Sequence, residues 1–309
     1  MAKLIKVGLA LGGGGARGLA HIGVLQALEE EKIPIDLMAG TSMGALVAGV
    51  YALYPQSPRV IRKFQDYLAS KTFQKTNPEF LHDHVDKEFS KFEGIFQRFS
   101  RFIKKGFFYS QSLAKKSAIS EEIFQQNMEV LLDDVEIQNT VIPLAVIALD
   151  LKSGEEVVIK KGPLRKAVSA SCAIPGILPP VKFLGKELID GGWIDKVPIH
   201  PLREMGADLI IAVDVAEGLD EVEDLSTGLG IFLRSYEISR YALSAWQLQE
   251  ADIVISPDVS NIHWADFGQF ENCLQAGLDA AKQKIPIIKK LISNKKIKKI
   301  LRGPFFWIK

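Results

Sequence analysis

Short continuous runs of apolar residues alternate with segments of helical periodicity along most of this chain. The first run, at residues 4–11, ends in four glycines, and residues 17–32 then carry apolar side chains at helical spacing. A second run at residues 35–40 follows Pro34 and leads into a small, apolar segment that ends near residue 53. Two consecutive strand–helix units predict a parallel sheet covered by helices.

Five further apolar runs and two long helical segments continue this alternation. The runs lie at residues 141–150, 156–160, 188–190, 208–215 and 252–256, and the helical segments at 224–250 and 269–282. The runs are continuously apolar, which is typical of strands that are buried on both faces. No repeat or low-complexity linker divides the chain. We therefore predict one α/β domain over residues 1–283, with a mostly parallel central sheet flanked by helices.

Residues 58–135 interrupt this pattern with a helical, aromatic-rich insertion. Ten of the 17 phenylalanines fall between Phe64 and Phe108. Within the insertion, Phe89, Phe92, Phe96, Phe99 and Ile103 recur every three or four residues, and lysines and arginines take the other faces. One interpretation is a helical cap packed onto the sheet. The other is a lid or a membrane-facing element, because basic amphipathic helices also bind anionic bilayers.

Residues 284–309 form a basic tail with its own amphipathic pattern. No Asp or Glu follows Asp279, whereas ten Lys or Arg residues occur from Lys282 onward, so the overall charge of +1 hides an acidic body. Pro286 is expected to start a helix and Gly303 to help end it. Such a tail is typical of peripheral contact with an anionic membrane. The alternatives are a terminal helix packed on the acidic body, or a nucleic-acid-binding patch.

Composition and the two cysteines narrow the class of protein. The chain has 47% hydrophobic and 24% charged residues, which is typical of soluble globular proteins. This composition excludes a disordered protein, a collagen and a disulfide miniprotein. Cys172 and Cys273 lie far apart with no neighbouring metal-ligand pattern, so we expect a reducing compartment and no metal. The first residues lack the features of a signal peptide. We therefore expect a cytoplasmic protein, with peripheral association at the inner face of the membrane.

Residues 40–44 carry the clearest chemical motif. Gly40-Thr41-Ser42-Met43-Gly44 is a G-x-S-x-G sequence between a predicted buried strand and a predicted helix, where such a motif forms a nucleophile elbow. The sharp turn would project the Ser42 hydroxyl alone into a cleft, and flanking glycines allow close backbone approach. The helix N-terminus would add N–H donors where an oxyanion forms. The alternative is an ordinary strand–helix turn capped by Thr41 or Ser42.

The glycines at residues 12–15 have two interpretations. Gly13, Gly15 and Gly18 match the G-x-G-x-x-G pattern of dinucleotide-binding folds, which would make the chain a nucleotide-binding oxidoreductase. That fold requires an acidic residue at the end of the second strand, whereas in this chain Asp36 lies at the beginning of the second predicted strand. The other interpretation is an oxyanion hole, built from the N–H groups of Gly12, Gly13, Gly14 and Gly15. Arg17 would orient this loop, bind an acidic group or form a surface ion pair.

A catalytic serine needs a base, and the sequence offers several. Asp150, Asp190 and Asp214 end apolar runs, and His200 and His263 are downstream imidazoles that would complete a Ser–Asp–His triad. The pair Gly191-Gly192 after Asp190 allows a tight turn that would bring its carboxylate against Ser42. Spacing alone leaves these alternatives open. His21 falls in the first predicted helix, where helix packing or loop bracing is the expected role.

Four sequence blocks together resemble the patatin-like phospholipases of the compact bacterial type. They are GGGGARGLAHIGVL at 12–25, GTSMGA at 40–45, SASCAIPGILPPV at 169–181 and DGGWIDKVPI at 190–199. The last strand and loop of the family also resemble residues 251–267, so the likeness extends over about residues 4–282. One difference lies at residues 194–198, where this chain reads IDKVP and the family often has an asparagine–proline pair.

This resemblance implies a Ser42–Asp190 dyad in place of a triad, with the loop of Gly12 to Gly15 and Arg17 at the oxyanion hole. It also implies that the wall of the pocket is shaped by Ser169, Ser171 and Pro175. No cofactor, metal or nucleic acid is expected. The implied activity is hydrolysis of carboxyl esters of phospholipids or lysophospholipids, through an acyl-enzyme at Ser42. The alternatives are a non-catalytic, membrane-associated interaction protein that retains the fold, and the nucleotide-binding oxidoreductase.

Overall fold

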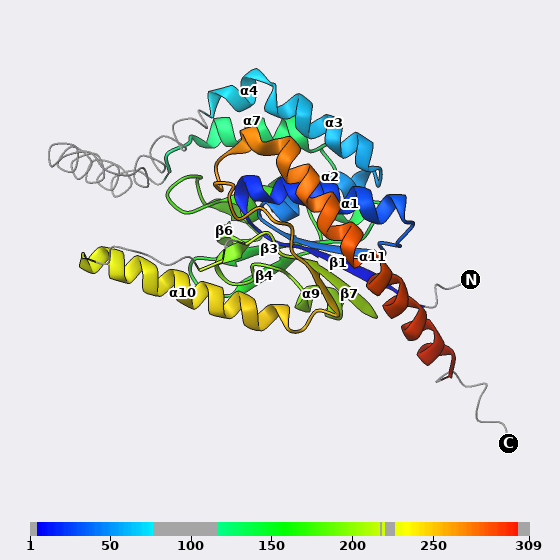
Figure 1. Cartoon of the computed structure of the whole chain (residues 1–309). Coiled ribbons are helices and arrows are strands. Elements are labelled where there is room, and N and C mark those ends of the chain that lie inside the picture. The colour runs from blue at the N-terminus through cyan, green and yellow to red at the C-terminus, as the bar shows by residue number, and fades with distance from the viewer. Residues whose placement is uncertain (1–4, 77–116, 217, 220–225, 302–309) are drawn as a thin grey trace.

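The computed structural model describes residues 5–76, 117–216, 218–219 and 226–301, and it has helices on both faces of one eight-stranded sheet (Figure 1). The strand order is β5-β6-β3-β2-β1-β7-β8, and β4 pairs with β3. The strands are β1 (Val7–Leu11), β2 (Leu37–Thr41), β3 (Leu144–Asp150), β4 (Glu156–Ile159), β5 (Val181–Phe183), β6 (Lys186–Asp190), β7 (Leu209–Val213) and β8 (Ile253–Ile255).

The sheet is mixed, with a parallel part and an antiparallel part. β3, β2, β1, β7 and β8 are parallel neighbours in that order. β4 and β6 run antiparallel to β3, and β5 runs antiparallel to β6. Every residue of β1, β2 and β7 is buried, as the continuous apolar runs predicted. The predicted α/β class with a mostly parallel sheet is therefore confirmed, and the short strand β5 is an addition to it.

Helices cover both faces of the sheet (Figure 1). One face carries α1 and α2 with α11 beside them, and the other carries α9 and α10. The longer described helices are α1 (Ala20–Glu30), α2 (Met43–Leu53), α3 (Ser57–Leu68), α7 (Glu121–Leu131), α8 (Leu164–Cys172), α10 (Gly228–Leu248) and α11 (Phe270–Leu301). Two shorter ones are α4 (Lys71–Lys75) and α9 (His200–Glu204).

The uncharged stretch at residues 37–54 consists of β2, a turn and α2, as the sequence predicted. Within the described ranges, no helix is both long and apolar enough to cross a membrane.

The described parts of residues 58–135 contain α3, α4 and α7, and they pack onto the domain. In α3 and α7 the apolar side chains Phe64, Tyr67, Phe124 and Met128 are buried. Tyr67 also donates a hydrogen bond to the Asn127 side chain at 2.8 Å, which ties α3 to α7. This agrees with a helical cap, although the limits of the insertion stay a prediction. The predicted amphipathic helix with Phe89, Phe92, Phe96, Phe99 and Ile103 lies outside the described residues.

The basic tail begins inside α11, which runs without a break from Phe270 to Leu301. The prediction that Pro286 starts a helix is wrong, because Pro286 lies in the interior of this longer helix. Ile285, Ile288 and Ile292 are buried in the main core, so burial against the domain extends the helix past the proline.

Four lysines of α11 form ion pairs with acidic residues of the body: Lys282 with Glu30, Lys289 with Glu31, Lys295 with Asp252 and Lys299 with Asp208. The described tail therefore packs on the acidic body. Membrane contact by the tail stays a prediction, and residues 302–309 lie outside the described part of the chain.

Candidate active site

Ser42 occupies a strained turn between β2 and α2. Its backbone has a φ of 54°, a left-handed value that is rare for a residue with a side chain. The turn brings backbones into contact, because a Cβ at Gly40 would lie 2.6 Å from the Ala45 backbone, and one at Gly44 would overlap the carbonyl oxygen of Leu11. The Ser42 amide donates a hydrogen bond to Ser171 Oγ at 2.9 Å, which fixes the turn to α8. The turn thus has the geometry of a nucleophile elbow.

Asp190 reaches Ser42 from the other side of β3. Thr41, at the end of β2, is opposite Ile147 of β3, and Asp190, at the end of β6, is opposite Ala148. Ser42 and Asp190 line the same pocket, and the Ser42 side chain lowers the pKa of the Asp190 carboxyl. The Gly192 amide donates to Asp190 Oδ1 at 2.7 Å, because the chain turns sharply after the strand. The structure therefore brings together the two residues that the family resemblance implies as a dyad.

Burial raises the pKa of the Asp190 carboxyl from 3.8 to about 6. The Ser42 side chain, the hydrogen bond from the Gly192 amide and the positive charge of Arg240 act in the opposite direction and limit the rise. A carboxyl with this pKa is mostly ionised at neutral pH, yet it is a much stronger base than an exposed aspartate. Its environment thus suits proton abstraction from a hydroxyl.

The glycine loop lies at the carboxyl end of β1, next to the elbow. The Gly12 amide donates to Val213 O at 3.0 Å, and the Gly13 amide donates to Lys196 O at 2.9 Å. Among the described residues, no acceptor engages the amides of Gly14 and Gly15, and both glycines line the pocket beside Ser42. The φ of 57° at Gly15, and the Trp264 carbonyl that a Cβ there would overlap, require glycine at that position.

The His21 side chain supports this loop from α1. Its Nε2 lies 2.7 Å from the carbonyl oxygen of Gly12, and the ring is fully buried. Burial lowers the pKa of His21 to about 4, so the ring is neutral at pH 7 and donates Nε2–H to that oxygen. This is the loop-bracing role that the sequence predicted for His21.

Arg17 is also buried and lines the pocket, where it contributes a positive charge near the glycine loop. Ser171 contacts the elbow, as described above. Ser169 is buried, with its hydroxyl unpaired among the described residues.

A pocket of about 380 Å³ opens over Ser42 and Asp190. It is lined by apolar Ile174, Ile177, Leu219 and Leu248, by cationic Arg17, Lys196 and Arg240, and by acidic Asp190, Asp214 and Glu237. The mixture of apolar and cationic groups suits a molecule with a hydrocarbon part and an anionic part.

Arg240 of α10 is a site residue that the sequence analysis missed. Its Nη2 donates to the carbonyl oxygen of Gly192 at 3.1 Å, and its guanidinium lies 4.9 Å from the centre of the Trp193 ring. The Trp193 ring is stacked on Tyr236, with centroids 5.2 Å apart. Arg234 and Arg240 are the only cationic residues of α10, and nothing in the sequence indicates which of them reaches the site.

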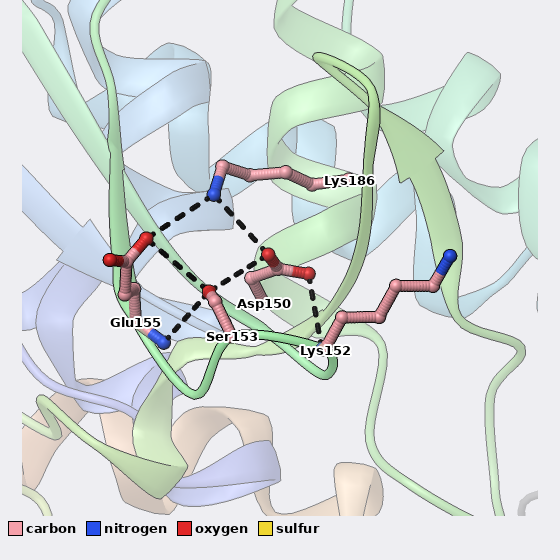
Figure 2. Close-up of polar contacts among 5 residues, drawn as sticks. All are labelled: Asp150, Lys152, Ser153, Glu155 and Lys186. Atoms are coloured by element: carbon pink, nitrogen blue, oxygen red, sulfur yellow. Dashed lines mark hydrogen bonds and ion pairs between the residues drawn. The ribbon is translucent and has the colours of Figure 1, made fainter.

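The other candidate carboxylates have different surroundings. Asp150 is the last residue of β3, and its partners are different: Figure 2 shows Lys186 between Asp150 and Glu155, and its ion pairs with them measure 3.2 and 3.5 Å. Burial raises the pKa of Asp150, but hydrogen bonds from Ser153, Lys152 and Lys186 outweigh it and hold the pKa below its usual value. Asp150 is therefore a structural carboxylate. Asp214 lines the pocket, and its Oδ1 accepts a hydrogen bond from the Ala216 amide at 2.9 Å.

The two downstream histidines lie outside the pocket lining within the described part of the chain. His200 is exposed and pairs with Glu204 at 3.4 Å within α9. His263 accepts a hydrogen bond from the Ala265 amide at 3.3 Å and stacks obliquely on Trp264. The geometry therefore offers Asp190 rather than a histidine as the direct partner of Ser42.

Comparison with known proteins places this site in a family. A model of the patatin-like phospholipase family matches residues 9–203. Lysophospholipase NTE1 of Scheffersomyces stipitis is 27% identical over 94% of this chain and 19% of its own length. Patatin-like phospholipase domain-containing protein 6 of Homo sapiens is 31% identical over 83% of this chain and 16% of its own length. The chain thus spans less than a fifth of these two relatives. The crystal structure of VipD from Legionella pneumophila aligns with a TM-score of 0.46 and 15% identity, over 91% of this chain and 66% of that one. With the family model matched over most of the chain, the chain belongs to the patatin-like phospholipase family.

Proposed function

We propose that this chain is a serine acyl hydrolase that cleaves carboxyl esters of lipids with a Ser42–Asp190 dyad. The observation that carries the proposal is the placement of the Ser42 side chain, at a strained strand–helix turn, in the same pocket as the buried Asp190 carboxylate. A nucleophile beside a base is the arrangement that activates a hydroxyl. The family match and the lysophospholipase name of one relative support the same reaction class.

Acylation begins when Asp190 takes the proton of Ser42 while the serine oxygen attacks the ester carbonyl. Negative charge develops on the carbonyl oxygen, and the amides of Gly14 and Gly15, which no acceptor among the described residues engages, are donors on that side of the pocket. When the tetrahedral intermediate collapses, the C–O bond to the leaving alcohol breaks, and Asp190 gives its proton to that alcohol. The products of this half-reaction are a free alcohol and an acyl group on Ser42.

Deacylation repeats these steps with water. Asp190, again ionised, takes a proton from a water molecule that attacks the acyl carbon, and the oxyanion is stabilised at the same amides. The bond to Ser42 Oγ then breaks, and Asp190 returns the proton to that oxygen. A fatty acid leaves and the enzyme is restored. The rise of the Asp190 pKa to about 6 helps both steps, because a stronger base takes the proton more readily.

The pocket supports phospholipids or lysophospholipids as substrates. Ile174 and Ile177 offer apolar contacts to an acyl chain, and Arg17, Lys196 and Arg240 provide positive charge for a phosphate. Asp214 and Glu237 also line the pocket, so a zwitterionic headgroup finds partners of both signs.

The proposal is tested by hydrolysis of short-chain esters, lysophospholipids and diacyl phospholipids by the purified wild type and Ser42→Ala. The matched control is Ser260→Ala, which removes an exposed hydroxyl that is not part of the pocket lining. We expect the wild type and the control to cleave lipid esters equally, and Ser42→Ala to be inactive. Activity in purified Ser42→Ala would exclude the dyad, and an inactive wild type would favour the non-catalytic interaction protein.

A further inference from the structure

Helix α10 exposes a continuous uncharged arc to solvent. At about 100° per residue, the side chains that share this side of the helix are Ile231, Phe232, Ser235, Ile238, Ser239, Ala242, Leu243 and Trp246. All eight are exposed, with Phe232 at 67% and Trp246 at 62%. We call these residues the outer arc of α10. Large apolar side chains gathered on one exposed helix face are typical of an interaction surface.

The opposite side of α10 holds the helix against the site. Arg240 donates to the Gly192 carbonyl, Gln247 donates to the Ile194 carbonyl at 3.0 Å, and Tyr236 stacks on Trp193. Tyr241 lines the pocket and is still 45% exposed, so it lies between the pocket and the outer arc. In Figure 1 the helix runs along the side of the sheet opposite α1 and α11. Helix α10 therefore contributes one side to the pocket and exposes the adjacent side, the outer arc, to solvent.

The polar groups of the outer arc are already satisfied within the helix. Ser235 Oγ donates to the Ile231 carbonyl at 2.8 Å, and Ser239 Oγ donates to the Ser235 carbonyl at 2.9 Å. The nearest charges, Arg234 and Glu237, pair with each other at 2.8 Å beside the arc. Transfer of such a face into an apolar medium leaves no hydroxyl without a partner, which removes the main penalty of burying polar groups.

We propose that the outer arc of α10 docks on a lipid surface and sets the pocket mouth at Tyr241 against the lipids. The choice of a lipid surface rests on the proposed function, because a lipid ester must leave its aggregate to reach Ser42. An uncharged face with internally bonded hydroxyls suits the acyl and interfacial region of a bilayer, and tryptophan and phenylalanine are typical of helices that lie there. Since the arc carries no charge, docking through it should depend little on salt, unlike contact through the basic tail.

The test compares binding of two double variants to phosphatidylcholine vesicles at low and high salt. Phe232→Ser with Trp246→Ser removes the two most exposed aromatic side chains of the arc. Val130→Ser with Val141→Ser removes exposed apolar side chains of α7 and the loop before β3, as the matched control. Both are made in the Ser42→Ala background as well, so that binding is measured without turnover. We expect roughly a tenfold or greater loss of vesicle partitioning for the arc variant only, since burial of large apolar side chains provides the binding.

Three results would overturn this proposal: equal vesicle binding by the arc and control variants, binding lost in high salt, or a wild-type dimer that becomes monomeric in the arc variant. The last result would identify the arc as an interface between two copies. Far-ultraviolet circular dichroism checks the fold. Hydrolysis of a soluble short-chain ester separates this proposal from the previous one, because failure of the dyad abolishes that hydrolysis and failure of docking leaves it unchanged.

Discussion

Asp190 meets Ser42 in one pocket across β3, the strand that lies between β2 and β6. β6 runs antiparallel to β3 and ends with Asp190 opposite Ala148, the residue after the Ile147 that lies opposite Thr41. The register of the sheet therefore sets Asp190 at the level of the turn that follows Thr41.

The rate of ester hydrolysis should depend on the ionisation of Asp190. Only the ionised carboxylate accepts a proton, so we expect kcat/KM to rise with pH and to level off above a midpoint near pH 6. Asp190→Asn should remove the activity as completely as Ser42→Ala, because a nucleophile and its only base act as a unit. The measurement is the pH profile of kcat/KM for a soluble ester. The same measurement is made on His200→Ala and His263→Ala, which should keep most activity. A histidine variant as inactive as Asp190→Asn would point to a triad.

The same carboxylate should destabilise the folded protein at neutral pH. The folded pKa of Asp190 is raised above its unfolded value, so its contribution to stability is fully present below about pH 4 and is lost as pH rises through about 6. Asp190→Asn should thus be more stable than the wild type at pH 7.5, on the order of 3 kcal/mol at most, and the difference should shrink at pH 4. Thermal unfolding at both values measures this. An Asp190→Asn variant that is less stable than the wild type at pH 7.5 would contradict the raised pKa of the Asp190 carboxyl.

Arg240 should adjust the base without touching the nucleophile. Its positive charge lowers the pKa of Asp190, so Arg240→Met should raise that pKa and move the midpoint of the pH profile to higher pH. The loss of kcat/KM is then larger at pH 6 than at pH 8. Arg240→Lys should restore part of the shift, and Arg234→Met, on the same helix, should leave the midpoint in place. An unchanged midpoint of the pH profile in Arg240→Met would show that Arg240 contributes packing and no charge effect on Asp190.

His21 should stabilise the glycine loop through the Gly12 carbonyl. Removal of the donor in His21→Leu leaves that buried oxygen unpaired, which costs about 1–3 kcal/mol and should lower kcat. His21→Gln, which keeps an N–H donor, should recover part of both losses.

Protonation of His21 provides a second measurement. Its folded pKa of about 4 lies below the unfolded value, so its stability contribution is complete above about pH 6.5 and is lost as pH falls toward 4. His21→Gln should therefore lose less stability than the wild type between these values, as measured by urea unfolding. Parallel curves for the two proteins would mean that His21 is not buried as a neutral ring.

Local patterns predicted the parts of the fold that local physics determines. The continuous apolar runs gave the buried strands, and the glycines around Ser42 gave the strand–helix turn, since few other residues allow its close backbone contacts. The sequence did not predict strand β5, because its three residues are too few to show an alternation of apolar and polar side chains.

The prediction of a helix start at Pro286 was wrong because burial of Ile285 and Ile288 in the core outweighs the helix-breaking preference of proline. The contribution of α10 to the site could not be read from the sequence either. Arg240 reaches Gly192 through a long-range contact, and nothing within α10 specifies which of its faces meets the pocket.

The central claim is that Ser42 is a nucleophile activated by Asp190. Labelling of the purified protein with a fluorophosphonate, followed by peptide mass spectrometry, tests it most directly, because the reagent reacts only with an activated hydroxyl. We expect one labelled position, Ser42, with labelling absent in Ser42→Ala and strongly slowed in Asp190→Asn. Labelling at another serine, or labelling of Asp190→Asn at the wild-type rate, would contradict the account.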